Sequence, residues 1–184
     1  MKLRILAAVI AMLPITAHAA HWNVDRTKSH LGFTVRWSGE PFVATFKSWT
    51  ADIDFDQSDL THSHVAVTVE LASETSDTSE NDDALKGPEG FAVSQFPSAR
   101  FEASRFIYQG GDSYLALGTL MLHGVNREIQ LPFKLTISAN KARVEGKTTV
   151  SRLDFGLGRG EWATSNPIDH AVVIDVDLQA TKAT

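Results

Sequence analysis

The sequence has no cysteine among its 184 residues. This absence excludes disulfide bonds and a cysteine nucleophile. The glycine-any-serine-any-glycine motif that marks many serine hydrolases is also missing. The folded chain must therefore be held together by its hydrophobic core, and a chain of this length can bury one.

An excess of positive charge is also absent. The formal net charge is -5, and removing Lys2 and Arg4 with the leader described below would leave 15 basic against 22 acidic residues, a charge of -7. Such a balance disfavours unaided binding to phosphate backbones and to anionic membrane surfaces. We do not expect nucleic acid as a partner.

Beyond the first twenty residues, no apolar run approaches the roughly 20 residues that a spanning helix needs. The N-terminus itself has the pattern of a secretory signal peptide. Lys2 and Arg4 supply the positive region, residues 5–15 the apolar region, and 17–19 (Ala-His-Ala) a small-residue cleavage site. We therefore predict a cleaved signal peptide over residues 1–19, export of the mature chain, and one domain over residues 20–184.

Helical periodicity is scarce, and strand-like alternation replaces it. Short runs in which apolar and polar residues alternate are separated by turn residues, and they cover 31–37, 42–55, 65–71, 101–108, 114–122, 129–137, 143–151 and 172–179. The short connections predict antiparallel neighbours. Closing such a sheet removes its edges, so an all-β, single antiparallel barrel of about eight strands is expected, although a two-sheet sandwich also fits. The one helix-compatible segment is 80–86, with Ser79 as its N-cap and Gly87-Pro88 as its stop.

The central hairpin, residues 114–137, has an unusual first strand. In the second strand one face is apolar and the other polar, but in the first strand both faces are apolar, so alternation does not decide which face turns inward. We expect Leu117 and Met121 to point inward. Pro132 interrupts the second strand and cannot donate to a ladder, so an opening, edge or bulge is expected beside it.

The inward-facing side chains could line a hollow interior or fill a solid one, and periodicity does not distinguish the two. The residues predicted to face inward are Phe33, Val35, Phe55, Val67, Leu71, Leu117, Met121, Leu131 and Phe133. The long polar connection 73–88 is either a solvated acidic loop or a lid over a binding site.

Candidate chemistry is sparse. His62 and His64 could place two imidazoles on one face, but further metal ligands are not evident, so no metal site is predicted. His123, Asp154 and Glu161 are of the types used in acid-base catalysis, yet His123 lies in a turn, and no catalytic residue is predicted. The glycine-rich loop 156–160 joins strands, whereas dinucleotide-binding loops join a parallel strand to a helix, so it is expected to be a packed connection.

Several segments together resemble the YceI-like family of periplasmic lipid-binding proteins. The resemblance spans nearly all of the mature chain, and the segments that carry it are Trp-Asn-Val-Asp at 22–25, Ser-His-Leu-Gly-Phe-Thr-Val at 29–35, Ile-Asp-Phe-Asp at 53–56, Asp-Ala-Leu at 83–85, Phe91, Phe-Pro at 96–97, Ala-Arg-Phe at 99–101, Gly-Thr-Leu-Met-Leu-His-Gly-Val at 118–125, Ile129, Leu131, Pro132 and Arg-Leu-Asp-Phe-Gly at 152–156. It implies a lipocalin-like barrel in the periplasm whose tunnel holds a long isoprenoid lipid, of the ubiquinone or polyprenyl type.

The resemblance also implies further details of the site. Leu85, Phe91, Phe155 and Trp162 join the expected ligand-binding residues. Residues 158–162 (Gly-Arg-Gly-Glu-Trp) resemble a subgroup associated with cytochrome b561-type membrane proteins, which implies quinone chemistry nearby and such a protein as a partner. No cofactor is expected besides the bound lipid.

The sequence leaves three functional classes open. The first is a non-enzymatic lipid carrier. The second is a lipid-modifying hydrolase or redox enzyme that uses His123, Asp154 or Glu161. The third is an adhesion or interaction module with a filled core. The oligomeric state also stays open, a dimer included.

Overall fold

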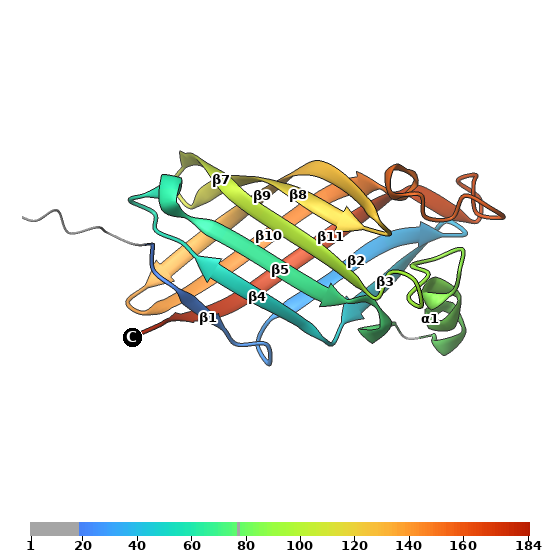
Figure 1. The fold of residues 1–184 in the computed structure, drawn as a ribbon, viewed down its shortest axis with the longest axis horizontal. Coiled ribbons are helices and arrows are strands. Elements are labelled where there is room, and N and C mark those ends of the chain that lie inside the picture. Colours follow the sequence, from blue (N-terminus) through green and yellow to red (C-terminus); the bar gives the residue numbers. More distant parts are fainter. Residues whose placement is uncertain (1–18, 77) are drawn as a thin grey trace, which may run out of the picture.

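A computed structural model describes residues 19–76 and 78–184 of the chain (Figure 1). The predicted signal peptide therefore lies, apart from Ala19, outside the described residues. Within the described part the elements are β1 (Trp22–Val24), β2 (His30–Trp37), β3 (Glu40–Phe46), β4 (Trp49–Asp54), η1 (Leu60–His62), β5 (His64–Glu70), η2 (Leu71–Ser73), β6 (Glu74–Thr75), α1 (Ser79–Lys86), β7 (Ser98–Gly110), β8 (Ser113–Leu122), β9 (Val125–Ser138), β10 (Lys141–Ser151), η3 (Arg152–Phe155) and β11 (Ile168–Lys182). No helix among them is long and apolar enough to cross a membrane.

The strands form one antiparallel sheet that curls into a barrel (Figure 1). Its order is β4-β5-β7-β8-β9-β10-β11-β2-β3-β6, with β1 added to β11. From β7 to β11 neighbours in sequence are neighbours in the sheet; short turns connect β7 to β10, and a longer segment with η3 joins β10 to β11. His123 and Gly124, which form the turn between β8 and β9, have positive φ angles of 52° and 72°. The predicted all-β antiparallel barrel is confirmed.

The structure has more strands than predicted, because one expected strand is two. The run 42–55 breaks at Lys47-Ser48 into β3 and β4, which lie near opposite ends of the sheet order. The change of parity between Phe46 and Trp49 therefore marks a strand break. Two strands of three and two residues, β1 and β6, complete the eleven-stranded sheet of the described chain.

The edge strand β4 is tied to the rest of the barrel at its two ends. At one end the Lys47 N–H donates to the Ser73 carbonyl over 3.1 Å. At the other end the Phe55 N–H donates to the Ala20 carbonyl over 2.8 Å, and His21 pairs with Asp54 in an isolated bridge. These contacts join the two edges of the curled sheet without a continuous ladder.

The sheet opens beside Pro132, as the sequence predicts. The ladder between β9 and β10 runs from the turn only as far as the pair Phe133–Gly146. Beyond this point the hydroxyl of Thr148 donates to the Gln130 carbonyl over 2.7 Å and spans the gap. On its other side Pro132 stays in register with Leu115 of β8, so the irregularity affects one edge of β9 only.

The helix α1 covers one end of the barrel, beside β3 and close to the loop that follows η3 (Figure 1). It starts at Ser79, one residue before the expected start, with Thr78 in place of Ser79 as its N-cap, and it ends at Lys86, with Gly87 as its C-cap before Pro88, as predicted. Leu85 is buried, and with Phe91 it belongs to the cluster of apolar side chains at this end. A second cluster, built around Trp22, Phe55 and Tyr114, occupies the interior of the barrel elsewhere.

Candidate functional site

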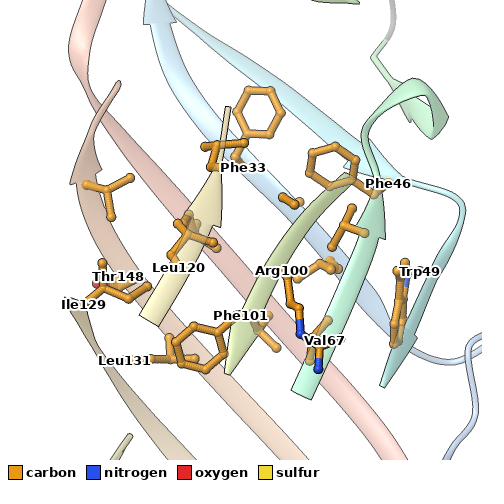
Figure 2. A pocket seen from close by; sticks show the side chains of 18 of the residues that line it. Phe33, Phe46, Trp49, Val67, Arg100, Phe101, Leu120, Ile129, Leu131 and Thr148 are labelled. Atoms are coloured by element: carbon orange, nitrogen blue, oxygen red, sulfur yellow. The ribbon is translucent and has the colours of Figure 1, made fainter. Parts of the chain in front are cut away.

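The interior of the barrel contains a cavity of about 260 Å³. Ligand pockets commonly measure about 300–1,000 Å³, so this cavity lies just below that range. Side chains from all the long strands line it, and Figure 2 shows Phe33, Val67, Leu120 and Leu131 around one part of it. The interior is therefore hollow, which the sequence pattern left undecided and which a filled adhesion module would not show.

Aromatic rings form much of the wall. In one cluster Phe55 contacts Phe106 edge to face, with ring centroids 5.2 Å apart, while Phe133 stacks on Tyr114 at 5.5 Å. In the other cluster Phe33 meets Phe91 edge to face at 5.9 Å. Offset and edge-to-face contacts of this kind stabilise a rigid apolar surface. Contacts between aromatic rings therefore make up a large part of the wall.

Eleven of the thirteen residues predicted to bind the ligand line this cavity. They come from β2, β5, η2, α1, β9, η3 and three loops, and they are Phe33, Val35, Phe55, Val67, Leu71, Leu85, Phe91, Leu131, Phe133, Phe155 and Trp162. Their contact with a ligand stays a prediction, since their position shows only that they face the same space.

The predicted orientation of β8 was wrong. Leu117 and Met121 do not line the cavity, whereas Ala116 and Leu120 do. Ala116 is 3% exposed and Leu120 8%, while Leu117 and Met121 are partly buried on the other face. Both faces of this strand are apolar, so only its pairing with β7 and β9 fixes which one turns inward.

Several lining residues were absent from the prediction. Trp22 and Trp49 are buried in the wall at 5% and 4% exposure. Trp49 lies on the same face of its run as Phe55, so the alternation of the sequence already indicated that Trp49 points inward. Trp22 belongs to a strand of three residues, too short for periodicity to reveal. Other lining residues missed include Phe46, Phe101, Phe106, Ile129, Val150, Ile168, Val172, Ile174 and Leu178.

Three charged residues lie along the cavity wall, and each is already engaged by the protein. Arg100 donates from Nη1 to the Thr68 hydroxyl over 3.1 Å and from Nε to Glu102 over 2.9 Å. The carboxylate of Glu89 accepts the Gly160 N–H over 2.9 Å. Arg152, the third, is satisfied by backbone carbonyls. None of the three is left as a free clamp for a charged ligand.

Arg152 organises the loop between η3 and β11. The residue is 6% exposed. Its guanidinium donors reach the carbonyls of Leu157 at 3.0 Å, Gly158 at 3.1 Å, Thr164 and Ile168 at 2.9 Å, Asp169 at 3.0 Å, and Trp162. Burial lowers the pKa of Arg152. Five N–H groups in a planar fork suit this task, which one ammonium group cannot reproduce.

The glycine-rich loop 156–160 is a packed connection, as predicted. Two of its glycine amides are engaged by Glu89, because the Gly158 N–H donates to the Glu89 carbonyl over 2.8 Å and the Gly160 N–H donates to the Glu89 carboxylate. Gly156 and Gly158 adopt positive φ angles of 77° and 64°, a conformation that favours glycine. The loop therefore presents no cradle of free amides to a phosphate.

The structure does not assemble His123, Asp154 and Glu161 into a catalytic group. His123 lies in the turn between β8 and β9, where its ring packs 4.5 Å from Phe96 and its Nδ1 lies 3.2 Å from the Phe155 carbonyl. Asp154 and Glu161 are exposed. None of the three belongs to the cavity wall, so an enzyme acting on a ligand inside the barrel would have to use other groups.

The two histidines considered as metal ligands separate in the structure. His62 pairs with Asp59 over 2.7 Å, while His64 lies on β5 opposite Asp54 of β4. Among the described residues, His21, Asp52 and Asp54 form one group whose ligand atoms lie within 4.8 Å of one another. These side chains are about half exposed or more, and the 2.9 Å contact between His21 and Asp54 serves to close the barrel.

Comparison with known proteins agrees with this architecture. The chain is 25% identical over 159 residues to a UPF0312 protein of Vibrio parahaemolyticus, covering 82% of this chain and 84% of the relative. It is 27% identical over 176 residues to a UPF0312 protein of Pseudomonas fluorescens, covering 91% of this chain and 85% of the relative.

Solved structures share the fold. BcnA of Burkholderia cenocepacia superposes with a TM-score of 0.83 at 24% identity, covering 86% of this chain and all of BcnA. A polyisoprenoid-binding domain from Saccharophagus degradans gives 0.70 at 19% identity, covering 90% of this chain and all of the domain. The YceI-like domain model matches residues 22–180, and the chain therefore belongs to the YceI-like domain family.

Proposed function

We propose that this protein binds a long isoprenoid lipid, of the ubiquinone or polyprenyl type, and carries or stores it in the periplasm. The observation that carries the proposal is the apolar cavity inside the barrel, whose charged wall residues are all engaged by the protein itself. Each methylene group that leaves water for such a cavity gains about 0.8 kcal/mol. A long apolar chain can therefore be held without any charged clamp.

The choice of ligand class rests on two further observations. The polyisoprenoid-binding domain from Saccharophagus degradans has the same fold. The segment 158–162 resembles the subgroup associated with cytochrome b561-type membrane proteins, and its Trp162 lines the cavity. Ubiquinone exchanged with such a membrane protein is thus the specific form of the proposal, and the signal-like leader 1–19 supports the periplasm as the compartment.

The test is to identify what the protein carries. The full chain is expressed with its leader in a Gram-negative host, purified from the periplasmic fraction without detergent, and extracted with organic solvent for mass spectrometry. We expect close to one isoprenoid molecule per protein molecule. Recovery of the protein from the cytoplasm alone, with its leader uncleaved, would contradict the proposed compartment. An extract without isoprenoid, together with no binding of added ubiquinone, would contradict the proposed function.

A further inference from the structure

A carboxyl group is buried beside the cavity without a visible partner. Glu74, on the short strand β6, is 1% exposed. Among the residues that the structure describes, neither of its two carboxylate oxygens has a hydrogen-bond partner. Burying an unpaired carboxylate is costly, so such a group favours its neutral form.

The pairing of β6 shows which way Glu74 faces. Glu74 lies directly opposite Phe46 of β3, and opposite residues of an antiparallel pair share one face of the sheet. Phe46 lines the cavity and packs against the ring of Phe33 at 5.9 Å. Glu74 itself is not a lining residue, so its carboxyl lies in the wall, next to the apolar space.

The helix α1 brings charged groups to Glu74. Among the strands, α1 contacts chiefly β6, and it contributes Asp82 and Lys86 to the surroundings of this carboxyl. On the other side of β6, Thr45 and Phe46 of β3 carry no titratable group. Burial, followed by the charge of Asp82, raises the pKa of Glu74 to about 7, and the charge of Lys86 opposes this rise.

Asp82 is held in the opposite state. It is buried, which by itself would raise its pKa, but the Ser76 hydroxyl and the Ser76 N–H, the latter at 2.9 Å, both donate to its Oδ1 and lower it. Asp82 therefore stays ionised where Glu74 is protonated. The docked helix accommodates one negative charge at this point and would be opposed by a second.

The same helix closes one end of the cavity. Leu85 of α1 and Phe91 beyond it both line the cavity, and the Phe91 N–H donates to the Leu85 carbonyl over 2.6 Å. Figure 1 shows α1 across the end of the barrel beside β3. Displacing α1 from β6 would withdraw Leu85 from the wall and open this end.

We propose that α1 is a lid over the cavity and that the protonation state of Glu74 decides how firmly the lid stays docked, an inference that rests on the proposed lipid-binding function. With Glu74 neutral, the lid stays docked and the lipid is retained. When Glu74 loses its proton, an unpaired carboxylate in an apolar wall faces ionised Asp82. Undocking relieves both costs, because water then reaches the carboxylate, and lipid exchange becomes faster.

The test measures exchange of a quinone probe against pH. Ubiquinone-2 is bound to the purified full-length protein, where the quenching of tryptophan fluorescence reports occupancy, and its release into excess lipid vesicles is followed by stopped flow between pH 5.5 and 8.5. If Glu74 has an ordinary pKa of 4.5 in the open state and about 7 in the docked state, the open population, and with it the release rate, rises about tenfold between pH 6 and pH 8. The rise should level off above pH 8.

Three variants test this result. E74Q replaces the carboxyl by a neutral group of the same shape, so its release should stay slow and independent of pH. E70Q changes an exposed glutamate on the adjoining strand β5 and should keep the wild-type profile. D82N removes the negative charge that helps to raise the pKa of Glu74 in the docked state. The docked pKa should therefore fall, so the release rate should level off at a lower pH and its total rise should become smaller.

Failure of the lid and failure of the proposed function give different results. A release rate that does not change with pH, or a wild-type pH profile in E74Q, would overturn the lid. If ubiquinone-2 bound at no pH, the proposed function would fail instead, and amide hydrogen exchange over residues 79–86 would still decide the lid. After correction for intrinsic exchange, protection there should fall about tenfold from pH 6 to pH 8 in wild type and stay constant in E74Q; equal behaviour of the two proteins would refute the inference.

Discussion

The indole N–H of Trp22 donates to the carbonyl of Phe55 over 3.0 Å, joining two residues that are 33 positions apart. Both side chains are buried in the cavity wall, Trp22 at 5% exposure and Phe55 at 6%. The bond lies where β1 meets the end of β4, so it helps to tie an edge of the curled sheet to the strand added on β11. The short N-terminal strand is thus part of the closure of the barrel.

Replacing Trp22 with phenylalanine should weaken this closure. W22F leaves the Phe55 carbonyl without its donor and leaves unfilled space, and together these effects should lower the free energy of unfolding by about 2–3 kcal/mol. Urea denaturation followed by circular dichroism would measure the loss. The control is W37F, at a partly buried tryptophan packed 5.8 Å from Trp162, and a loss for W22F no greater than for W37F would contradict the role in closure.

The two faces of β8 should respond differently to the same added ring. Ala116 faces the cavity and Leu117 faces away from it, so A116F should fill ligand space and weaken ubiquinone-2 binding by about tenfold or more, as overpacking costs about 1–3 kcal/mol. L117F should leave the affinity within about twofold, because this side chain lies outside the cavity. A tenfold change would require about 1.4 kcal/mol of binding free energy. Fluorescence titration gives both affinities. Weaker binding in L117F with normal binding in A116F would restore the orientation expected from the sequence.

Stability should fall as pH rises toward neutrality. The pKa of Glu74 is raised from 4.5 to about 7 in the folded protein, so between these values the unfolded chain is ionised at this carboxyl while the folded protein is not. Unfolding then releases a proton. The contribution of Glu74 to the free energy of unfolding is therefore fully present below pH 4.5 and is lost as pH rises through 7. The loss should reach about 3 kcal/mol.

Urea denaturation at pH 5 and pH 8 measures this dependence. E74Q should abolish the part of the loss that belongs to Glu74, and E70Q should retain it. The lowered pKa of Asp25, about 2, acts in a separate and more acidic range with the opposite sign. A wild-type and an E74Q protein that lose equal stability between pH 5 and pH 8 would show that Glu74 titrates normally.

Arg152 should not be replaceable by lysine. R152K keeps the charge but removes the planar fork that serves the loop carbonyls, leaving several of them unpaired, so the free energy of unfolding should fall by about 2–4 kcal/mol. Amide hydrogen exchange should show the loop 156–167 losing protection. R159K, at an exposed arginine of the same loop, should change stability by less than about 0.5 kcal/mol, and similar losses in the two variants would contradict the central role of Arg152.

Much of the fold could be predicted, because in a strand that alternates between apolar and polar residues the apolar residues indicate which face turns inward. On β5, Val67 alternates with His64 and Thr68, so its inward position followed from the sequence. Pro132 similarly indicated the gap between β9 and β10, because a residue without an N–H cannot continue a ladder on that side. The turn at His123 and Gly124 could also be predicted, because it falls between two strand-like runs of the sequence.

Other features had no local signal. The break between Phe46 and Trp49 separates strands that lie at distant places in the sheet, and a change of parity alone does not distinguish a bend from such a break. Glu74 resembles any other acidic residue of the stretch 73–88. Its burial arises only because β6 pairs with β3 and α1 packs over it.

The sequence by itself determined the all-β antiparallel barrel and most of its inward face, because a period of two is a property of the strand alone. Only the tertiary structure decided that the interior is hollow, that Ala116 rather than Leu117 faces it, and that Glu74 is buried beside it. These features depend on how the walls are spaced and on which strands pair. Both are set by contacts between residues far apart in the chain, and local alternation carries no record of them.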